Sequence, residues 1–450
     1  MFHKLQSEDY SESVDGDAFE EEETVEERPT RSRQILLVAT YIISMLSINC
    51  PAAVYNPMID EKILTSAEAV QVVGFESYGI AFGKFFFGAC SDMFGARRVM
   101  GVCFGVMSFL LLLFSAGSSV HFIAVIAFLL EAANSSIWPS HICIVRGWYS
   151  LANIAEGTRL LGFSSRGGAM LANALYGALF MLGMYWRSLL RYVTIPICII
   201  GIFLSRLHRD TRIHSDFIGE NPSLEAWKKN IKIVLSAREF WCAAASMGCC
   251  TIVKRIGVIT PIFYFATSKS IISVGNSVAM GIIYQTGLLT GTIIGGHYYT
   301  KLKGDHNAKI YLMQKLNMMS TLGCVLLGCL GLFGQNSSYF ILCLEAVLAF
   351  GIAFGVSTSY YIIPGLFSVL FGGEKRGAMA SACLDCFAYV CASTFLLLQK
   401  GIVSSPIGWS GVWWTVAFFN FLVVMLVKPM ERILQQLENP EGDVIEIPNM

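Results

Sequence analysis

Two apolar segments meet in the stretch Gly83-Lys84-Phe85-Phe86-Phe87-Gly88-Ala89-Cys90-Ser91-Asp92-Met93-Phe94-Gly95-Ala96-Arg97-Arg98. Gly83 and Gly88 have no Cβ, so they predict a helix face that approaches another helix closely. Asp92 is placed to cap the following helix and to pair with one of the two arginines, and Gly95 favours a tight turn. A turn held by charges that break and re-form is typical of a protein with two alternating states. The alternative is an ordinary polar turn between membrane helices.

The spacing G-K-x-x-x-G-x-x-S-D-x-x-G-x-R-R resembles the signature between helices 2 and 3 of the major facilitator superfamily of transporters. The resemblance implies an all-α membrane protein with twelve transmembrane helices in two pseudo-symmetric six-helix bundles. It also implies that these residues control the change between states: Gly83, Lys84, Gly88, Asp92, Gly95, Arg97 and Arg98.

The composition indicates a membrane protein. Hydrophobic residues make up 54% of the chain and charged residues only 14%, with a mean hydropathy of +0.58, which excludes an ordinary soluble domain of this length. The net charge is zero, and nothing favours nucleic-acid binding. Nearly all of the fourteen cysteines lie in apolar runs without companion histidines, so we expect buried hydrophobes, no metal and no cofactor.

The hydropathy pattern divides the chain into two sets of six spans, each about 20 residues or longer. Basic residues cluster in alternate connections, which predicts that both termini are cytoplasmic, in the plasma membrane or an endomembrane. The predicted spans are 34–56, 68–90, 97–117, 120–145, 155–184, 189–206, 240–266, 272–299, 309–333, 338–366, 376–399 and 407–428. The predicted domains are a disordered acidic tail (1–33), a first bundle (34–206), a cytoplasmic linker (207–238), a second bundle (239–428) and a C-terminal tail (429–450).

Shorter stretches resemble the organophosphate:phosphate antiporter family, which exchanges sugar phosphates. They are Trp138-Pro139, Arg255-Ile256-Gly257-Val258 and Lys375-Arg376-Gly377-Ala378. That family pairs a basic residue on its first helix with the helix 7 arginine to clamp one phosphate. Here Met45 or a neighbour falls at that place. Because one arginine alone compensates a buried dianion poorly, the departure counts against phosphate esters unless Arg166 or Lys254 substitutes.

Ionisable side chains at membrane depth are costly, so each is a functional candidate. Lys254 and Arg255 are neighbours on the seventh span, and adjacent helical residues point about 100° apart, so we expect only one to face a cavity. Arg255 is favoured because its planar guanidinium suits a carboxylate or phosphate. The alternative is a structural pair with Asp385 or Glu345.

Arg166 lies near the middle of the fifth span, and Glu131 and Glu76 are its expected counter-charges. A carboxylate that has no partner could carry a proton. Coupling or gating is therefore assigned to Glu76, Glu131, Asp385 and Glu345, with structural pairs as the alternative. Trp138 and Tyr264 are assigned to substrate contact beside Arg255, Lys254 and Arg166, with packing or lipid contact as the alternative for the aromatic residues.

The sequence therefore predicts a monomeric secondary transporter, not an enzyme, that moves a small, anionic organic solute by alternating access. Coupling is by counter-anion exchange or by protons, with phosphate or carboxylate as candidate species and the bilayer as the other partner. No nucleotide-binding motif is found. The alternative is a non-transporting sensor or assembly protein that keeps the fold. In that case the acidic tail would bind a partner.

Overall fold

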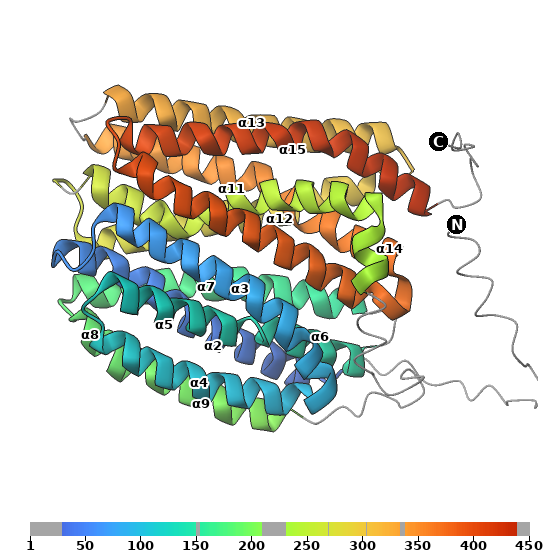
Figure 1. Ribbon diagram of the computed structural model, residues 1–450, viewed down its shortest axis with the longest axis horizontal. Helices are drawn as coiled ribbons and strands as arrows, with labels where there is room; N and C mark the ends of the chain where they lie inside the picture. The colour runs from blue at the N-terminus through green and yellow to red at the C-terminus, as the bar shows by residue number, and fades with distance from the viewer. Residues whose placement is uncertain are drawn as a thin grey trace, which may run out of the picture.

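The computed structural model describes residues 29–149, 154–208, 231–268, 270–302, 304–333 and 338–438. Long helices run side by side along one direction and connect at the two ends of the molecule (Figure 1). The first half contains α2 (Arg31–Asp60), α3 (Ser66–Phe94), α4 (Ala96–Ala116), α5 (Val120–Asn134), α6 (Ile137–Trp148), α7 (Ile154–Met181), α8 (Trp186–Leu189), the π-helical segment η1 (Leu190–Thr194) and α9 (Ile195–Leu207). The second half contains α11 (Arg238–Ser268), α12 (Val274–Lys301), α13 (His306–Phe333), α14 (Tyr339–Val403) and α15 (Gly408–Glu438).

Ten helical segments within the described residues are long and apolar enough to cross a membrane. The helices α3 and α7 have 29 and 28 residues, a sufficient length, but charged and glycine residues lower their hydropathy. With these two, twelve helical segments of the described chain are long enough to span a bilayer, which is consistent with the predicted all-α membrane fold. The long helix α14 supplies two passes, Tyr339–Ser368 and Ala380–Val403.

Several predicted helix ends were wrong. The helix α2 begins at Arg31, and α15 continues to Glu438, ten residues past the predicted end of the last span. The predicted tenth and eleventh spans are one helix by backbone geometry, α14. The acidic tail up to residue 28, linker residues 209–230 and the tail after residue 438 lie outside the described residues.

The predicted fourth span is broken into α5 and α6, and the break lies just before the Trp138-Pro139 pair. Ser135 Oγ donates to the Glu131 carbonyl at 2.8 Å, and Ser136 Oγ donates to the Ala133 carbonyl at 2.7 Å. These hydroxyls satisfy carbonyls at the end of α5, which allows the chain to turn and start a new helix.

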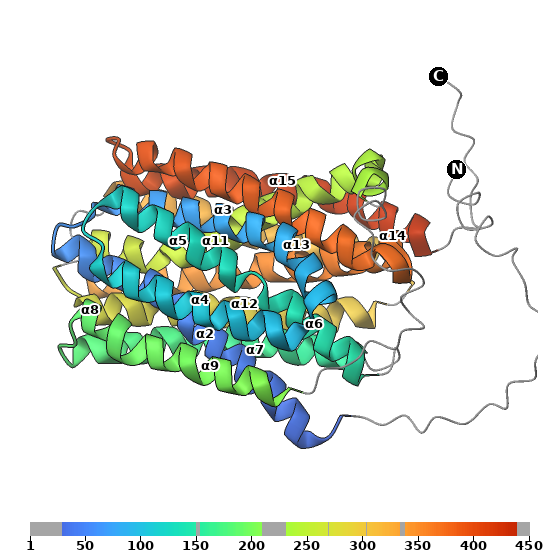
Figure 2. The same cartoon turned by 60° about the horizontal axis from the view of Figure 1, so that its bottom comes forward.

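Each half packs mainly within itself. In the first half α3 packs against α5, α2 against α7 and α4 against α9, and in the second half α13 packs against α15 while α14 packs against α11 and α12. Two extensive contacts join the halves, α3 with α14 and α7 with α12. Figure 2 shows the same parallel arrangement after rotation. The interface between the halves is therefore formed mainly by these four helices.

The predicted close-packing glycines are confirmed where the structure describes them. A Cβ on Gly83 would collide with the backbone of α5 at Ala132. Gly287, Gly291 and Gly295 on α12 face α14 in the same way, without room for a methyl group. Gly95 has φ +85° and makes the turn between α3 and α4, as predicted. The surroundings of Gly88 and the side chain of Asp92 are not described, so the predicted pairing of Asp92 with Arg97 or Arg98 stays a prediction.

Candidate substrate and coupling site

A ladder of polar contacts follows the α3–α14 interface from the end where α2 turns into α3, the left-hand end in Figure 1. Lys400 Nζ donates to Gln71 Oε1 at 2.7 Å, and Ser393 Oγ donates to the Gly74 carbonyl at 2.6 Å. The hydroxyls of Tyr78 and Thr394 lie 3.0 Å apart. These contacts hold the two halves together at this end.

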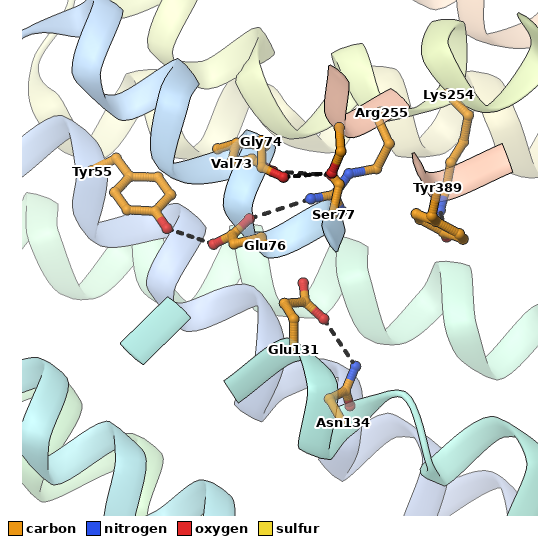
Figure 3. A network of polar contacts seen from close by, with 11 residues as sticks. Tyr55, Val73, Gly74, Glu76, Ser77, Glu131, Asn134, Lys254, Arg255 and Tyr389 are labelled. Carbon is orange, nitrogen blue, oxygen red and sulfur yellow. Dashed lines mark hydrogen bonds and ion pairs between the residues drawn. The ribbon is translucent and has the colours of Figure 1, made fainter. Parts of the chain in front are cut away.

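A buried ion pair lies further along the same interface (Figure 3). Arg255 Nη2 on α11 lies 3.3 Å from Glu76 Oε2 on α3, and both side chains are nearly inaccessible. The Tyr55 hydroxyl on α2 donates to the other carboxylate oxygen, Glu76 Oε1, at 2.5 Å. Three helices from both halves therefore converge on one carboxylate. The alternative of a structural pair named Asp385 or Glu345 as the partner of Arg255, whereas the partner in the structure is Glu76 on α3.

A second ion pair joins Lys84 on α3 to Asp385 on α14. Both side chains are 16% exposed, so the pair is less deeply buried than the first. Lys84 belongs to the signature stretch, and its Nζ also lies 5.3 Å from the centre of the Tyr389 ring. One residue of the predicted conformational signature thus makes a direct contact between the halves.

Lys254 has no carboxylate partner among the described side chains. Its Nζ donates to the Tyr389 hydroxyl at 2.9 Å and lies 5.4 Å from the ring centres of Tyr360 and Tyr389. Figure 3 shows Lys254 and Tyr389 beside the Arg255 side chain. Both neighbouring cations of α11 therefore contact the interface, because their long side chains diverge and still reach it. The expectation that only one of them faces a cavity stays a prediction.

Arg166 on α7 faces the second half. Its Nη1 donates to Gln285 Oε1 on α12 at 3.2 Å, and its guanidinium lies 5.1 Å from the Tyr361 ring centre. Its Nε is buried without a hydrogen-bond partner among the described residues. The predicted counter-charges, Glu131 and Glu76, do not pair with it, because Glu76 is occupied by the guanidinium from α11.

Glu131 on α5 is 7% exposed. Its carboxylate accepts one described hydrogen bond, from Asn134 Nδ2 at 3.4 Å. Figure 3 places its carboxylate on the side where Glu76 and Arg255 lie. It is within electrostatic range of both of these groups and of Lys254. The structure thus brings Glu131 into the cluster without giving it a cation of its own among the described side chains.

Three other predicted site residues have no described hydrogen bond or ion pair with this cluster of contacts. The Tyr264 ring is fully buried and packs against Phe263 at 5.3 Å between ring centres. Glu345 is 5% exposed on the first pass of α14, and its Oε2 has no hydrogen-bond partner in the described part of the chain. Trp138 is half-buried against Tyr41, with 5.8 Å between the ring centres. Both aromatic residues pack in the way that the alternative interpretation describes.

Met45, which the sequence resemblance places, with its neighbours, at the position of a basic residue, packs against α7. A Cβ on Gly168 would lie 2.6 Å from the Met45 Cβ, and Ser165 Oγ lies 3.8 Å from its sulfur. The position is therefore filled by an apolar side chain that adjoins the Arg166 segment. The positive charge of this segment is that of Arg166, which lies on α7.

Sequence reasoning missed Tyr55, Gln285 and Tyr389. Tyr389 follows Asp385 by four residues, so both lie on one face of the helix, and this spacing was a usable signal. For Tyr55 and Gln285 only the tertiary packing reveals the contact. Cys383 and Cys386 form a C-x-x-C run around this face, but both thiols are free, and the described residues contain no group of three metal-ligating side chains.

Comparison with known proteins agrees with this architecture. A mutant of the nucleoside transporter NupG has a TM-score of 0.68 at 13% identity, over 88% of this chain and 99% of that chain. A bacterial homologue of the human lysosomal transporter Spinster, in an inward-facing and occupied conformation, has a TM-score of 0.62 at 13% identity, over 92% of this chain and 98% of that chain. At these identities the likeness shows the fold alone.

No curated protein sequence matches the chain. The sequence model of the Major Facilitator Superfamily matches residues 37–392, which is most of the chain and includes both ion pairs between the halves. The chain therefore belongs to the Major Facilitator Superfamily.

Proposed function

We propose that this protein is a secondary active transporter of a small organic anion, which alternates access to its site by movement of the two helical halves. Membership of the superfamily supports the class of activity. The site chemistry supports an anion. The middle of the interface holds four described cations and three described carboxylates, so it has one excess positive charge when all are ionised. They are Lys84, Arg166, Lys254 and Arg255 against Glu76, Glu131 and Asp385.

The observation that carries the proposal is the convergence, on one aromatic pair, of two cations that have no carboxylate partner among the described side chains. Lys254 lies over Tyr360 and Arg166 lies over Tyr361, and these two rings are 4.8 Å apart. Lys254 comes from the second half and Arg166 from the first. An anion held between them would contact both halves at once, which is what a transporter needs to link binding to movement.

The same contacts bear on the substrate class. Arg255, the counterpart of the phosphate-binding arginine in the organophosphate antiporters, is occupied by Glu76, and Met45 is apolar. We therefore assign the anion to Arg166 and Lys254, with a carboxylate or a phosphate monoester as the charged group. Both termini are assigned to the cytoplasm from the distribution of basic residues. Coupling is by counter-anion exchange or by protons.

The proposal is tested first by ligand-dependent thermal stability of the purified protein in detergent. The ligands are inorganic phosphate, glycerol 3-phosphate, lactate and succinate, with glucose as the uncharged control. A ligand that binds the folded state raises the melting temperature. We expect stabilisation by at least one anion, and a Kd at least about tenfold weaker in Lys254→Met and Arg166→Gln, since a charge-assisted hydrogen bond contributes about 1.5–3 kcal/mol.

Lys400→Met is the matched control, because it also removes a lysine from the interface but one whose described partner is Gln71. Its anion affinity should equal that of the wild type. Uptake of the stabilising anion into proteoliposomes then tests transport itself. Binding without uptake would favour the non-transporting sensor, and equal loss of affinity in all three variants would refute the assignment of Arg166 and Lys254.

A further inference from the structure

The three carboxylates at the middle of the interface differ in their partners. Asp385 has Lys84, and Glu76 has both Arg255 and the Tyr55 hydroxyl. Among the described contacts, Glu131 has only a long hydrogen bond from the Asn134 amide. A buried carboxylate without a cation is strongly disfavoured, and such a group takes up a proton instead. Glu131 is thus the carboxylate whose surroundings suit the neutral acid.

The charged and polar groups around Glu131 come from three other helices. From α3 it faces Glu76, from α2 the Tyr55 hydroxyl, and from α11 across the interface Arg255 and Lys254. The like charge among these groups is Glu76 on α3. The cation Arg255 already pairs with Glu76.

Arg255 keeps N–H donors that no described group accepts. Its Nη2 contacts Glu76, whereas its Nε is buried without a hydrogen-bond partner among the described residues. An ionised Glu131 would compete with Glu76 for this guanidinium, while a protonated Glu131 would leave the guanidinium to Glu76. The charge on Glu131 therefore bears directly on a contact between the two halves.

We propose that Glu131 binds the coupling proton, and that its loss of the proton releases Arg255 from Glu76. This inference rests on the proposed function, because it selects protons over counter-anions as the coupling species. The proton comes from water at the open side and joins one Glu131 carboxylate oxygen, which becomes a neutral acid. With Glu131 neutral, the interface has two excess positive charges, so protonation favours the binding of an anion from the same side. The anion and the proton therefore cross the membrane together in the same direction.

The protonation itself is measured without any substrate. Infrared difference spectra of the protein in lipid, between about pH 5 and pH 8, report the carbonyl stretch of each carboxylic acid that titrates. We expect a band in the wild type that is absent in Glu131→Gln and displaced in Glu131→Asp. Glu345→Gln is the control, because Glu345 is also buried with an oxygen that lacks a described partner but lies outside the cluster. The band should persist in it.

Persistence of the band in Glu131→Gln, or its loss in Glu345→Gln, would overturn the assignment. Folding of each variant is checked by the melting temperature, and Glu131→Asp keeps the test decisive if the glutamine variant does not fold.

Proton movement is then followed with a pH-sensitive dye inside proteoliposomes after addition of lactate, succinate or phosphate. We expect the wild type to acidify the lumen as the anion enters, and Glu131→Gln to exchange labelled for unlabelled anion without acidification. Anion uptake by the wild type without acidification would refute proton coupling and leave the proposed transport intact. A Glu131 infrared band in a protein that moves no anion would refute the proposed function and leave the proton site intact.

Discussion

The Arg255–Glu76 pair allows a quantitative prediction. At 3.3 Å, two unit charges attract by about 5 kcal/mol if the effective dielectric constant is about 20. Removal of both charges from water opposes much of this attraction, so the net contribution of the pair is smaller. Loss of one partner is different, because the remaining charge stays buried, and the expected cost is about 3–5 kcal/mol. Arg255→Met should lower the free energy of unfolding by this amount.

Adding Glu76→Gln to Arg255→Met should recover most of the loss, because the amide oxygen still accepts the Tyr55 hydrogen bond and neither position then carries an uncompensated charge. The assay is reversible unfolding with sodium dodecyl sulfate in mixed micelles, for the wild type, both single variants and the double variant. We expect a coupling energy of at least about 2 kcal/mol between the two sites. Lys400→Met, which removes one hydrogen bond to a neutral group, should cost only about 0.5–1.5 kcal/mol.

The reasoning would be refuted if Arg255→Met and Lys400→Met were equally stable. It would also be refuted if Glu76→Gln added its own cost to that of Arg255→Met, because independent costs would show that the two charges do not compensate each other.

Further predictions concern packing, pH and the anion site. Gly83→Ala should destabilise the protein by about 1–3 kcal/mol, because its methyl group meets the backbone of α5, whereas Gly162→Ala has open space and should stabilise it by about 0.5–1 kcal/mol; unfolding in mixed micelles compares them. Burial lowers the pKa of His208 to about 4 from an ordinary 6.5, so the unfolded chain binds the proton first and stability falls as the pH drops from about 6.5 to about 4. His208→Leu should flatten the melting temperature over this range. Tyr389→Phe removes the only described hydrogen-bond acceptor of Lys254 and should change anion affinity, measured by the thermal shift. When Lys254→Met is also present, the proteins with Tyr and with Phe at position 389 should have the same anion affinity.

The fold was predictable because its signals are local. Runs of about 20 apolar residues require helices in a bilayer, and glycines such as Gly83 and Gly291 mark the faces where helices touch. The helix ends were less predictable. The break after Glu131 depends on two serine hydroxyls that bond carbonyls of the preceding turn, and serine occurs inside helices as well.

The site was only partly predictable. The hydrophobic surroundings of Glu76, Arg255 and Lys254 identified them as functional candidates from the sequence. Their partners depended on how two halves of the chain pack, and no local pattern contains that information. The pairing of Arg255 with Glu76, 179 residues away in sequence, is an example. Tyr264 and Glu345 show the converse, because burial alone does not place a residue at the interface.

The glycines of α12 have a consequence for the kind of motion that is available to the second half. Gly287, Gly291 and Gly295 recur at every fourth residue, and each meets α14 at close range. Contacts of this kind leave few flexible side chains that could change rotamer, so α12 cannot slide gradually along α14. Only a shift by a whole turn, about 5.4 Å, would restore a comparable register. We therefore expect α12 and the first pass of α14, Tyr339–Ser368, to travel together without gradual sliding between them.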